Sequence, residues 1–218
     1  MLKSLQEYHR KYLISVQAKT WTSMNNLFLS GNIRIGKSSL IRKCLIPYKN
    51  VLGGFSSQRL LDKSGKVVGY RLADADDFDV DRLSDPALSN VFISFEDGVR
   101  TTDLSVFEDN ACRMLTPRPG TRIMLLDEIG GLELRSEIFR SSIYELLRSD
   151  TPCIGVIKSK VRQPEEQLCN KDLRNYLAND PGSTIIELDN NDPLYEKGSE
   201  EILVHLEETI SDFLGSVI

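Results

Sequence analysis

The sequence has no long apolar run and few cysteines and histidines, and each shortage excludes a class of protein. No stretch approaches the roughly 18 consecutive apolar residues of a membrane-spanning helix, so we expect no membrane span. Residues 1–21 lack the continuous apolar segment of a secretory signal. Four cysteines and two histidines are scattered singly, without the CxxC or CxxH spacing of a zinc site. We therefore expect a cytoplasmic protein with reduced thiols and no zinc site.

Basic residues are also fewer than acidic residues. The 218 residues carry 27 Lys and Arg against 32 Asp and Glu, which gives a net charge of −5. A mildly acidic chain argues against a dedicated nucleic-acid-binding protein. Hydrophobic residues make up 40% and charged residues 27%, which is the balance of a folded globular domain. The length suits one large domain with a small addition.

The small addition is at the N-terminus. Over residues 1–20, apolar side chains recur at spacings of three and four among charged ones, a pattern typical of an amphipathic helix. We predict an N-terminal helical extension over 1–22, followed by the main domain over 23–218. Two interpretations of the helix stay open: it packs on the main domain, or it binds a protein partner.

Strand and helix patterns alternate along the main domain. Residues 51–61 and 66–75 flank the turn-forming segment 62–65 and predict an antiparallel hairpin. The alternation of the remaining elements predicts an α/β fold of three layers, in which helices cover a mostly parallel central sheet and the hairpin is an insertion. Apolar runs predict strands at 27–30, 91–98, 122–128, 153–158 and 183–189, and helical spacing predicts helices at about 37–45, 103–117, 136–150, 170–178 and 199–217.

Residues 31–38, GNIRIGKS, fit the pattern GxxxxGK[ST] of a phosphate-binding loop. The glycines allow successive main-chain N–H groups to turn inward around a phosphate, and the helix that begins near Gly36 directs its positive end at the same anion. Lys37 is placed to bridge the β- and γ-phosphates, and the Ser38 hydroxyl to ligate Mg²⁺. We predict that a nucleoside triphosphate binds along Gly31, Asn32, Ile33, Arg34, Ile35, Gly36, Lys37 and Ser38.

Two acids, Asp127 and Glu128, close the near-continuous apolar run of the predicted strand at 122–128. Ligands bind outside the carboxyl ends of parallel strands, so these acids are expected beside the phosphate loop. We assign Asp127 to Mg²⁺, directly or through water, and Glu128 to polarising the attacking water as a general base. The glycines that follow, Gly130 and Gly131, are open to two interpretations: close approach of the main chain to the site, or an ordinary strand-to-helix turn.

Five segments together resemble one known family. They are GNIRIGKSSL at 31–40, GGFSSQRL at 53–60, GVRTTDLSVFE at 98–108, LLDEIGGLEL at 125–134 and ELDNND at 187–192. This combination resembles the cancer-related nucleoside-triphosphatase family, and the similarity extends from about Leu27 to Leu206. The resemblance implies a single RecA-like P-loop domain that hydrolyses ATP, GTP and other nucleoside triphosphates with Mg²⁺.

The resemblance also implies roles for individual residues. Ser39 would complete the phosphate cradle, Arg59 would face the triphosphate, and Asn191 would lie close to the base. The sequence departs from the family in two places: Ile33-Arg34 stands where the loop usually has Pro-Gly, and Lys158-Ser159-Lys160 stands where a Thr- or His-bearing turn is usual. These differences concern rate and substrate range more than fold.

Several cations are candidates for stabilising a transferring phosphoryl group. Arg59 and Lys158 rank first among them because both follow predicted strands. The acidic stretch 74–81 lacks the central glycine and closing glutamate of a Ca²⁺ loop, so we interpret it as a solvated loop. The candidate cations are Arg59, Arg100, Lys158, Lys160 and Arg162.

The leading hypothesis is a Mg²⁺-dependent nucleoside triphosphatase that uses ATP or GTP. A small-molecule or nucleotide kinase is the first alternative, although its only candidate lid, 60–90, is acidic. A nucleotide-binding switch with little hydrolysis is the second, favoured by Arg34 and the N-terminal extension. Base preference is not readable, because main-chain contacts to phosphates ignore the base and no guanine-reading Asn-Lys-x-Asp motif is present.

Overall fold

A computed structural model describes residues 24–32, 35–79, 81–188 and 199–218. The predicted N-terminal helix at 1–22 and Asn191 lie outside these residues. Within the described part of the chain, no helix is both long enough and apolar enough to cross a membrane.

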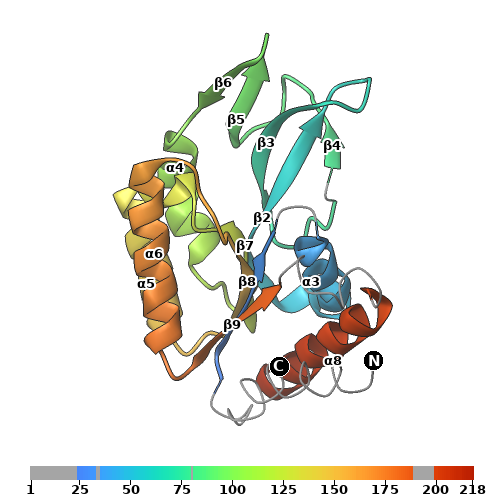
Figure 1. Cartoon of the computed structure of the whole chain (residues 1–218), viewed down its shortest axis with the longest axis vertical. Coiled ribbons are helices and arrows are strands. Elements are labelled where there is room, and N and C mark those ends of the chain that lie inside the picture. The colour runs from blue at the N-terminus through green and yellow to red at the C-terminus, as the bar shows by residue number, and fades with distance from the viewer. Residues whose placement is uncertain (1–23, 33–34, 80, 189–198) are drawn as a thin grey trace.

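The described residues form one nine-stranded sheet in the order β6-β5-β3-β2-β7-β8-β1-β9, with β4 paired to β2 beside this path (Figure 1). Parallel pairing joins β2, β7, β8, β1 and β9, whereas β3, β5 and β6 pair antiparallel. The strands are β1 Asn26–Gly31, β2 Leu52–Leu61, β3 Val67–Asp74, β4 Asp81–Leu83, β5 Val91–Glu96, β6 Val99–Thr102, β7 Ile123–Ile129, β8 Cys153–Ile157 and β9 Ser183–Leu188.

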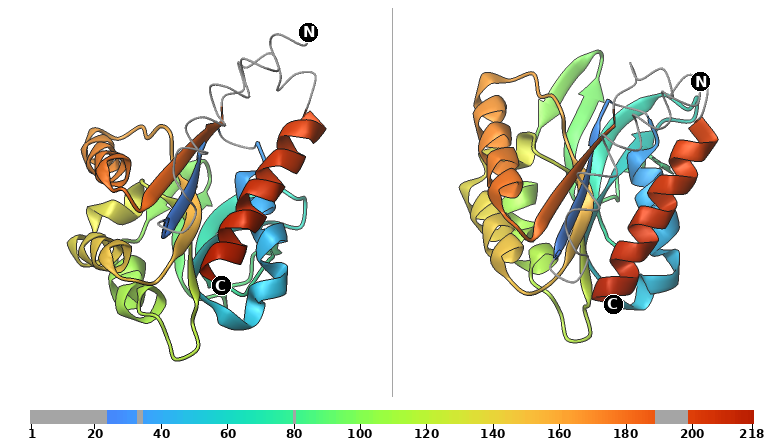
Figure 2. Two further views of the ribbon diagram at one scale, coloured as in Figure 1. Left: turned by 90° about the horizontal axis from the view of Figure 1, so that it is seen from below. Right: turned by 60° about the horizontal axis from the view of Figure 1, so that its bottom comes forward.

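Helices cover both faces of the parallel part. Helices α3 and α8 lie on one face, and α4, α5 and α6 lie on the other, which makes three layers (Figure 2). Strand β1 shows why: Phe28 packs into the core on one face, and its neighbours Leu27 and Leu29 pack into the core on the other. The helices are α3 Lys37–Leu45, η3 Ile46–Val51, α4 Ser105–Leu115, η4 Leu132–Arg135, α5 Glu137–Arg148, α6 Pro164–Asn179 and α8 Ser199–Val217.

The long strand β2 connects two different parts of the molecule. Its first half pairs parallel with β7, from Leu52 opposite Ile123 to Phe55 opposite Leu126. Its second half pairs antiparallel with β3. We call β3, β4, β5, β6 and this second half of β2 the antiparallel extension. It projects from the end of the sheet where the parallel strands finish (Figure 1).

The predicted α/β fold, with three layers and a mostly parallel sheet, is confirmed, but the insertion is larger than one hairpin. Strands β4 and β6 were not predicted, because β4 has three residues and β6 is exposed at every position, so neither shows the apolar alternation of a half-buried strand. Helix α6 begins at Pro164 and not near 170, since its first turns are rich in Glu and Gln and lack apolar spacing.

Candidate nucleotide site

The predicted phosphate loop joins β1 to α3. Gly36 lies in the left-handed region with φ 86°, which glycine adopts at little cost, and α3 starts at the next residue. The Lys37 side chain turns back over the loop, where Nζ donates hydrogen bonds to the carbonyl oxygens of Gly31 at 3.1 Å and Asn32 at 2.6 Å. Burial lowers the pKa of Lys37, while Glu128 and Asp127 oppose that shift. The loop therefore encloses a cation that faces two carboxylates.

A bulge in β7 separates the two predicted catalytic acids. Leu126 pairs with Gly155 and Ile129 with Ile157, so three steps along β7 match two along β8. Glu128 occupies the bulge with φ 65°, a left-handed conformation that costs a non-glycine residue about 1–3 kcal/mol and is typical of functional sites. The bulge directs Asp127 toward α3 and leaves Glu128 among the lysines of the site.

Asp127 contacts the helix that follows the phosphate loop. Its Oδ1 accepts a hydrogen bond from the Ser38 hydroxyl at 2.7 Å, and its Oδ2 pairs with Arg42 Nη2 at 2.7 Å. The expected proximity of Ser38 and Asp127 is thus present in the structure. Arg42 was not predicted. It lies four residues after Ser38, on the same face of α3, and that spacing is the one feature of the sequence that could have revealed it.

The Arg42 guanidinium joins four parts of the chain. Besides Asp127 on β7, it donates to the carbonyl oxygens of Ser57 on β2 at 2.9 Å and of Asp79, in the loop before β4, at 3.3 Å. Gln58 donates to the same Asp79 oxygen at 2.8 Å. The phosphate-loop helix is therefore tied directly to the base of the antiparallel extension.

The glycines after Glu128 allow close approach of side chains. A Cβ on Gly130 would lie 2.4 Å from Asn170 Nδ2, and one on Gly131 would lie 2.5 Å from Lys158 Nζ. Glu133 Oε1 accepts the N–H groups of Gly130 at 2.5 Å and Gly131 at 2.7 Å. Of the two interpretations of this segment, close approach describes it better than an ordinary turn. The groups that approach the glycines are the side chains of Asn170 and Lys158.

Electrostatics around Glu128 favour a general base. Burial raises the pKa of the Glu128 carboxyl, and the negative charges of Asp127 and Glu133 act in the same direction. Lys158 and Lys37 oppose this shift and favour the ionised form. Glu128 is thus a carboxylate with a raised proton affinity, close to two cations.

The residues present fit a magnesium ion. Mg²⁺ keeps several waters and is bound through one or two carboxylates together with substrate phosphates. Ser38 donates its proton to Asp127, so the lone pairs of its oxygen are available to a cation. Among the described residues no group of three or more His, Cys, Asp or Glu could hold a metal by itself, which suits an ion that takes its other ligands from phosphate and water.

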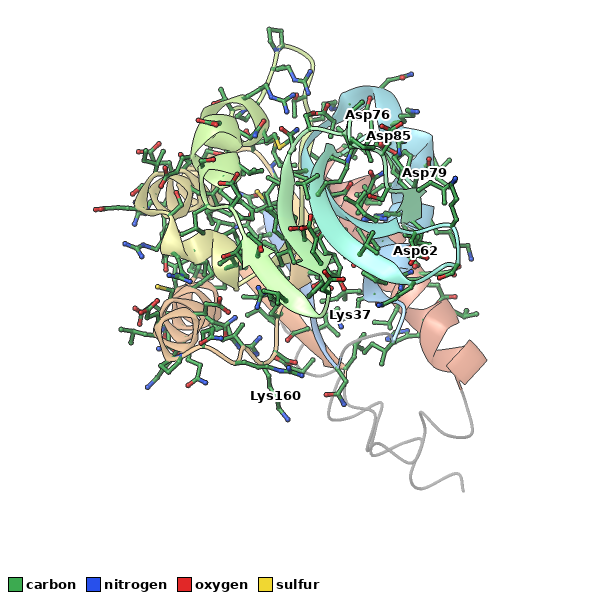
Figure 3. The ribbon with its side chains drawn as sticks, turned by 90° about the horizontal axis from the view of Figure 1, so that it is seen from above. Lys37, Asp62, Asp76, Asp79, Asp85 and Lys160 are labelled. Carbon is green, nitrogen blue, oxygen red and sulfur yellow. The ribbon has the colours of Figure 1, made fainter. Side chains whose placement is uncertain are left out.

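The other predicted site residues lie in different surroundings from Lys37, Asp127 and Glu128. Ser39 is exposed on α3, and Arg100, Lys160 and Arg162 are exposed. In Figure 3, Lys160 lies on one side of Lys37, and Asp62, Asp76, Asp79 and Asp85 lie on the other. Arg59 Nε lies 2.6 Å from Asp81 Oδ1 on β4. In the described part of the chain, no hydrogen bond or ion pair joins the Arg59 side chain to the phosphate loop. Ile33, Arg34 and Asn191 lie outside the described residues.

The acidic stretch is more structured than the predicted solvated loop. Four of its acids form ion pairs with arginines that come from β2, β3, β4 and α4, so the stretch is solvated only in part. The pairs are Asp74 with Arg113, Asp77 with Arg71 and Arg82, Asp79 with Arg82, and Asp81 with Arg59.

Comparison with known proteins decides the family. A family model described as NTPase matches residues 26–194. The chain belongs to this family. The nucleoside-triphosphatase THEP1 of Methanopyrus kandleri is 26% identical over 191 residues, which cover 84% of this chain and 98% of that protein. The nucleoside-triphosphatase THEP1 of Thermotoga petrophila is 24% identical over 155 residues, covering 67% and 79%.

Solved structures support the fold of this NTPase family member. THEP1 from the hyperthermophile Aquifex aeolicus superposes with a TM-score of 0.53 at 21% identity, covering 84% of this chain and 99% of that one. A human cancer-related nucleoside triphosphatase superposes with a TM-score of 0.52 at 19% identity, covering 85% and 98%. These two structures bear on the fold, and the family that the sequence resembles is confirmed by the family model over residues 26–194.

Proposed function

We propose that this chain is a Mg²⁺-dependent nucleoside triphosphatase that hydrolyses the γ-phosphate of ATP, GTP and other nucleoside triphosphates. The observation that carries the proposal is the 2.7 Å hydrogen bond from Ser38 to Asp127, residues 89 apart in sequence. It joins the phosphate loop to the carboxylates at the end of β7. Family membership supports the same activity.

In this proposal, different residues of the site bind the phosphates, hold the metal ion and activate the water. Loop N–H groups and Lys37 bind the β- and γ-phosphates. Ser38, with Asp127 behind it, would hold Mg²⁺, which when bound neutralises charge on the phosphate oxygens. Glu128 orients a water and takes its proton. As the bond from the water oxygen to the γ-phosphorus forms, the bond to the oxygen of the leaving diphosphate breaks.

Glu128 suits this role because its environment tunes its basicity. A general base is most effective when its pKa lies near the working pH. Burial raises the pKa of Glu128 toward that range, and Lys37 and Lys158 preserve the ionised form that accepts a proton. A nucleotide-binding switch with little hydrolysis would not need a general base at this position, whereas a kinase would use one to deprotonate its acceptor. The environment of Glu128 therefore favours a catalyst over a switch.

Phosphate release tests the proposal. ATP, GTP, CTP and UTP are incubated with and without Mg²⁺ and with the parent, Lys37→Ala and Glu128→Gln proteins. Glu128→Gln is expected to lose about 100-fold or more of kcat while nucleotide affinity stays unchanged, and Lys37→Ala to lose affinity. Glu145→Gln, an exposed residue on α5, is the matched control. Absence of phosphate release from the parent with every nucleotide would overturn the proposal.

Three finer proposals concern the contacts with the substrate, the role of the N-terminal segment and the location of the protein. Arg59 and Asn191 are proposed to contact the triphosphate and the base, and alanine variants compared across the four nucleotides test both. The N-terminal segment 1–22 is proposed either to pack on the main domain or to bind a protein partner. A cytoplasmic location completes the proposal, supported by the singly scattered cysteines, which suit reduced thiols.

A further inference from the structure

Lys158 is held between the phosphate loop and the carboxylate strand. It is the first residue after β8, the strand that lies between β7 and β1. Its main-chain N–H donates to the Ile129 carbonyl oxygen at 2.8 Å, and its own carbonyl oxygen accepts from Asn170 Nδ2 at 3.0 Å. The next residue, Ser159, donates from its hydroxyl to the Gly31 carbonyl oxygen at 3.0 Å. The backbone at Lys158 is therefore fixed to both halves of the nucleotide site.

The ammonium group of Lys158 is surrounded by acids from three elements. Glu128 on β7, Glu133 on η4 and Glu166 on α6 all raise the pKa of Lys158, against the effect of burial. Its side chain is 29% exposed, whereas Glu133 is 5% exposed. Lys158 is therefore a charged group in a half-buried place, open to a ligand on one side.

Glu133 holds this ammonium without binding it tightly. Lys158 Nζ lies 3.6 Å from Glu133 Oε2, beyond the usual range of an N–H···O hydrogen bond. The other oxygen, Oε1, is occupied by the N–H groups of Gly130 and Gly131. Because that turn fixes the carboxylate, Glu133 sets the position of the ammonium, whose remaining N–H donors can face a ligand.

The remaining cations of the sequence are less well placed. Arg59 is paired with Asp81 on the antiparallel extension, and Arg100 is exposed on β6. Lys160 and Arg162 are exposed in the loop after β8. Among these five candidates in the described part of the chain, Lys158 is the one whose charge interacts with Glu128.

We propose that Lys158 is a catalytic residue whose ammonium group contacts the γ-phosphoryl oxygens in the transition state, and that Glu133 is the positioning residue for it. The inference rests on the proposed function. Glu128 interacts electrostatically with Lys37, which binds the β- and γ-phosphates, and with Lys158. In this proposal the γ-phosphoryl group and the water that Glu128 orients lie between these two cations, with Lys158 Nζ held next to the Gly131 main chain. Charge that develops on the phosphoryl oxygens is stabilised by a donor already held in place.

The decisive experiment separates ground-state binding from transition-state binding. Lys158→Gln is compared with Lys160→Gln, a matched change two residues further along at an exposed position. Fluorescence titration with a labelled nucleoside diphosphate and Mg²⁺ measures ground-state affinity, and the same titration with aluminium fluoride added measures binding of a transition-state mimic. For Lys158→Gln we expect a kcat lower by about 100- to 1,000-fold, diphosphate affinity within about threefold of the parent, and loss of the tightening by aluminium fluoride. Lys160→Gln is expected to match the parent in all three.

Glu133→Gln tests the positioning role. An amide oxygen still accepts the two glycine N–H groups, but the charge that holds Lys158 is gone. We expect a loss of kcat of about tenfold with weaker tightening by aluminium fluoride, at unchanged diphosphate affinity. Lys158→Arg, which keeps the charge, is expected to recover part of the tightening. If Lys158→Gln unfolds, Lys158→Arg and Glu133→Gln carry the test alone.

The outcomes distinguish this inference from the proposed function. A parent protein that releases no phosphate overturns the proposed function. A parent that hydrolyses nucleotide and loses activity in Glu128→Gln, together with a Lys158→Gln variant as active as Lys160→Gln, overturns only the inference. The inference is also overturned if Lys158→Gln loses diphosphate affinity as strongly as it loses kcat. That result would indicate that Lys158 binds the ground state.

Discussion

Two arginine–aspartate pairs of almost equal length lie in different parts of the sheet. Arg42 and Asp127 are 2.7 Å apart with side chains 5% and 2% exposed. Arg59 and Asp81 are 2.6 Å apart with side chains 39% and 41% exposed. The first pair joins α3 to β7 where the parallel strands end, and the second joins β2 to β4 in the antiparallel extension. Since the lengths are alike, burial makes the difference between them.

Burial changes what a pair does for the molecule. Two charges removed from water are stable only when their remaining donors and acceptors are satisfied. Both Nη atoms of Arg42 and both carboxylate oxygens of Asp127 meet this condition through Ser57, Asp79, Ser38 and each other, whereas Arg42 Nε is buried without a partner among the described residues. An exposed pair is screened by water and salt and contributes little. The parallel part therefore holds its site rigidly, and the Arg42 guanidinium ties the extension to that site in addition to the shared strand β2 and the contacts with α4.

The largest predicted effect comes from breaking the buried pair. Arg42→Met leaves the Asp127 carboxylate buried without its main partner, and we expect a loss of about 3–5 kcal/mol in the free energy of unfolding. Urea unfolding monitored by circular dichroism measures it. The double variant Arg42→Met/Asp127→Asn should recover part of the loss, since no charge is left unpaired. A loss below about 1 kcal/mol for the single variant would show that the pair is not buried in solution.

A smaller effect is expected from crowding the strands of the site. A Cβ on Gly155 of β8 would lie 2.0 Å from the Leu126 carbonyl oxygen of β7, just before the bulge. Gly155→Ala should therefore destabilise the fold by about 1–3 kcal/mol and reduce hydrolysis, because Asp127 and Glu128 follow Leu126 directly. Gly69→Ala is the matched change in the extension, where a Cβ on β3 would lie 2.6 Å from the Ile93 carbonyl oxygen of β5. It is expected to keep full activity, and equal loss of activity in both variants would contradict the comparison.

Local patterns predicted the parallel part better than the extension. Continuous apolar runs identify β1, β7 and β8 because these strands are buried on both faces. The extension consists in part of short exposed strands such as β6, which carry no such pattern. Its ion pairs join residues from separate strands, and no sequence spacing indicates which acid meets which arginine.

The residues of the site also divide into some that the sequence predicted and others that it did not. The proximity of Ser38 and Asp127 follows from a rule about where parallel strands end. Arg42 and Glu133 were not predicted, because their roles depend on which strand faces α3 and on how η4 returns toward β7. For Arg42, the four-residue spacing from Ser38 is the one hint that the sequence holds. Glu133 lies in LLDEIGGLEL, one of the five segments of the family resemblance, yet the sequence assigned it no contact. Lys158 was one of five cations, and only the position of Glu128 distinguishes it from the others.

Removal of the Ser38 hydroxyl should have a modest effect on stability and a clear effect on metal dependence. Ser38→Ala removes one hydrogen bond to Asp127, whose pair with Arg42 stays, so we expect a cost of about 1 kcal/mol in the free energy of unfolding. Fluorescence titration with labelled nucleotide should show that Mg²⁺ no longer increases affinity. Ser141→Ala, an exposed serine on α5, serves as control. An undiminished effect of Mg²⁺ in Ser38→Ala would contradict the assignment of this hydroxyl to the metal.

The smallest predicted effect belongs to the exposed pair. Arg59→Met should change the free energy of unfolding by less than about 1 kcal/mol, and the difference from the parent should vanish in 1 M NaCl, where the Debye length is about 3 Å. Arg42→Met should keep most of its loss in the same salt, because water and ions do not reach the buried pair. Nucleotide affinity of Arg59→Met decides the role that the family resemblance implies for this residue. If Arg59 stays with Asp81 when nucleotide binds, affinity is unchanged, and a severalfold loss would instead show that it leaves Asp81 for the triphosphate.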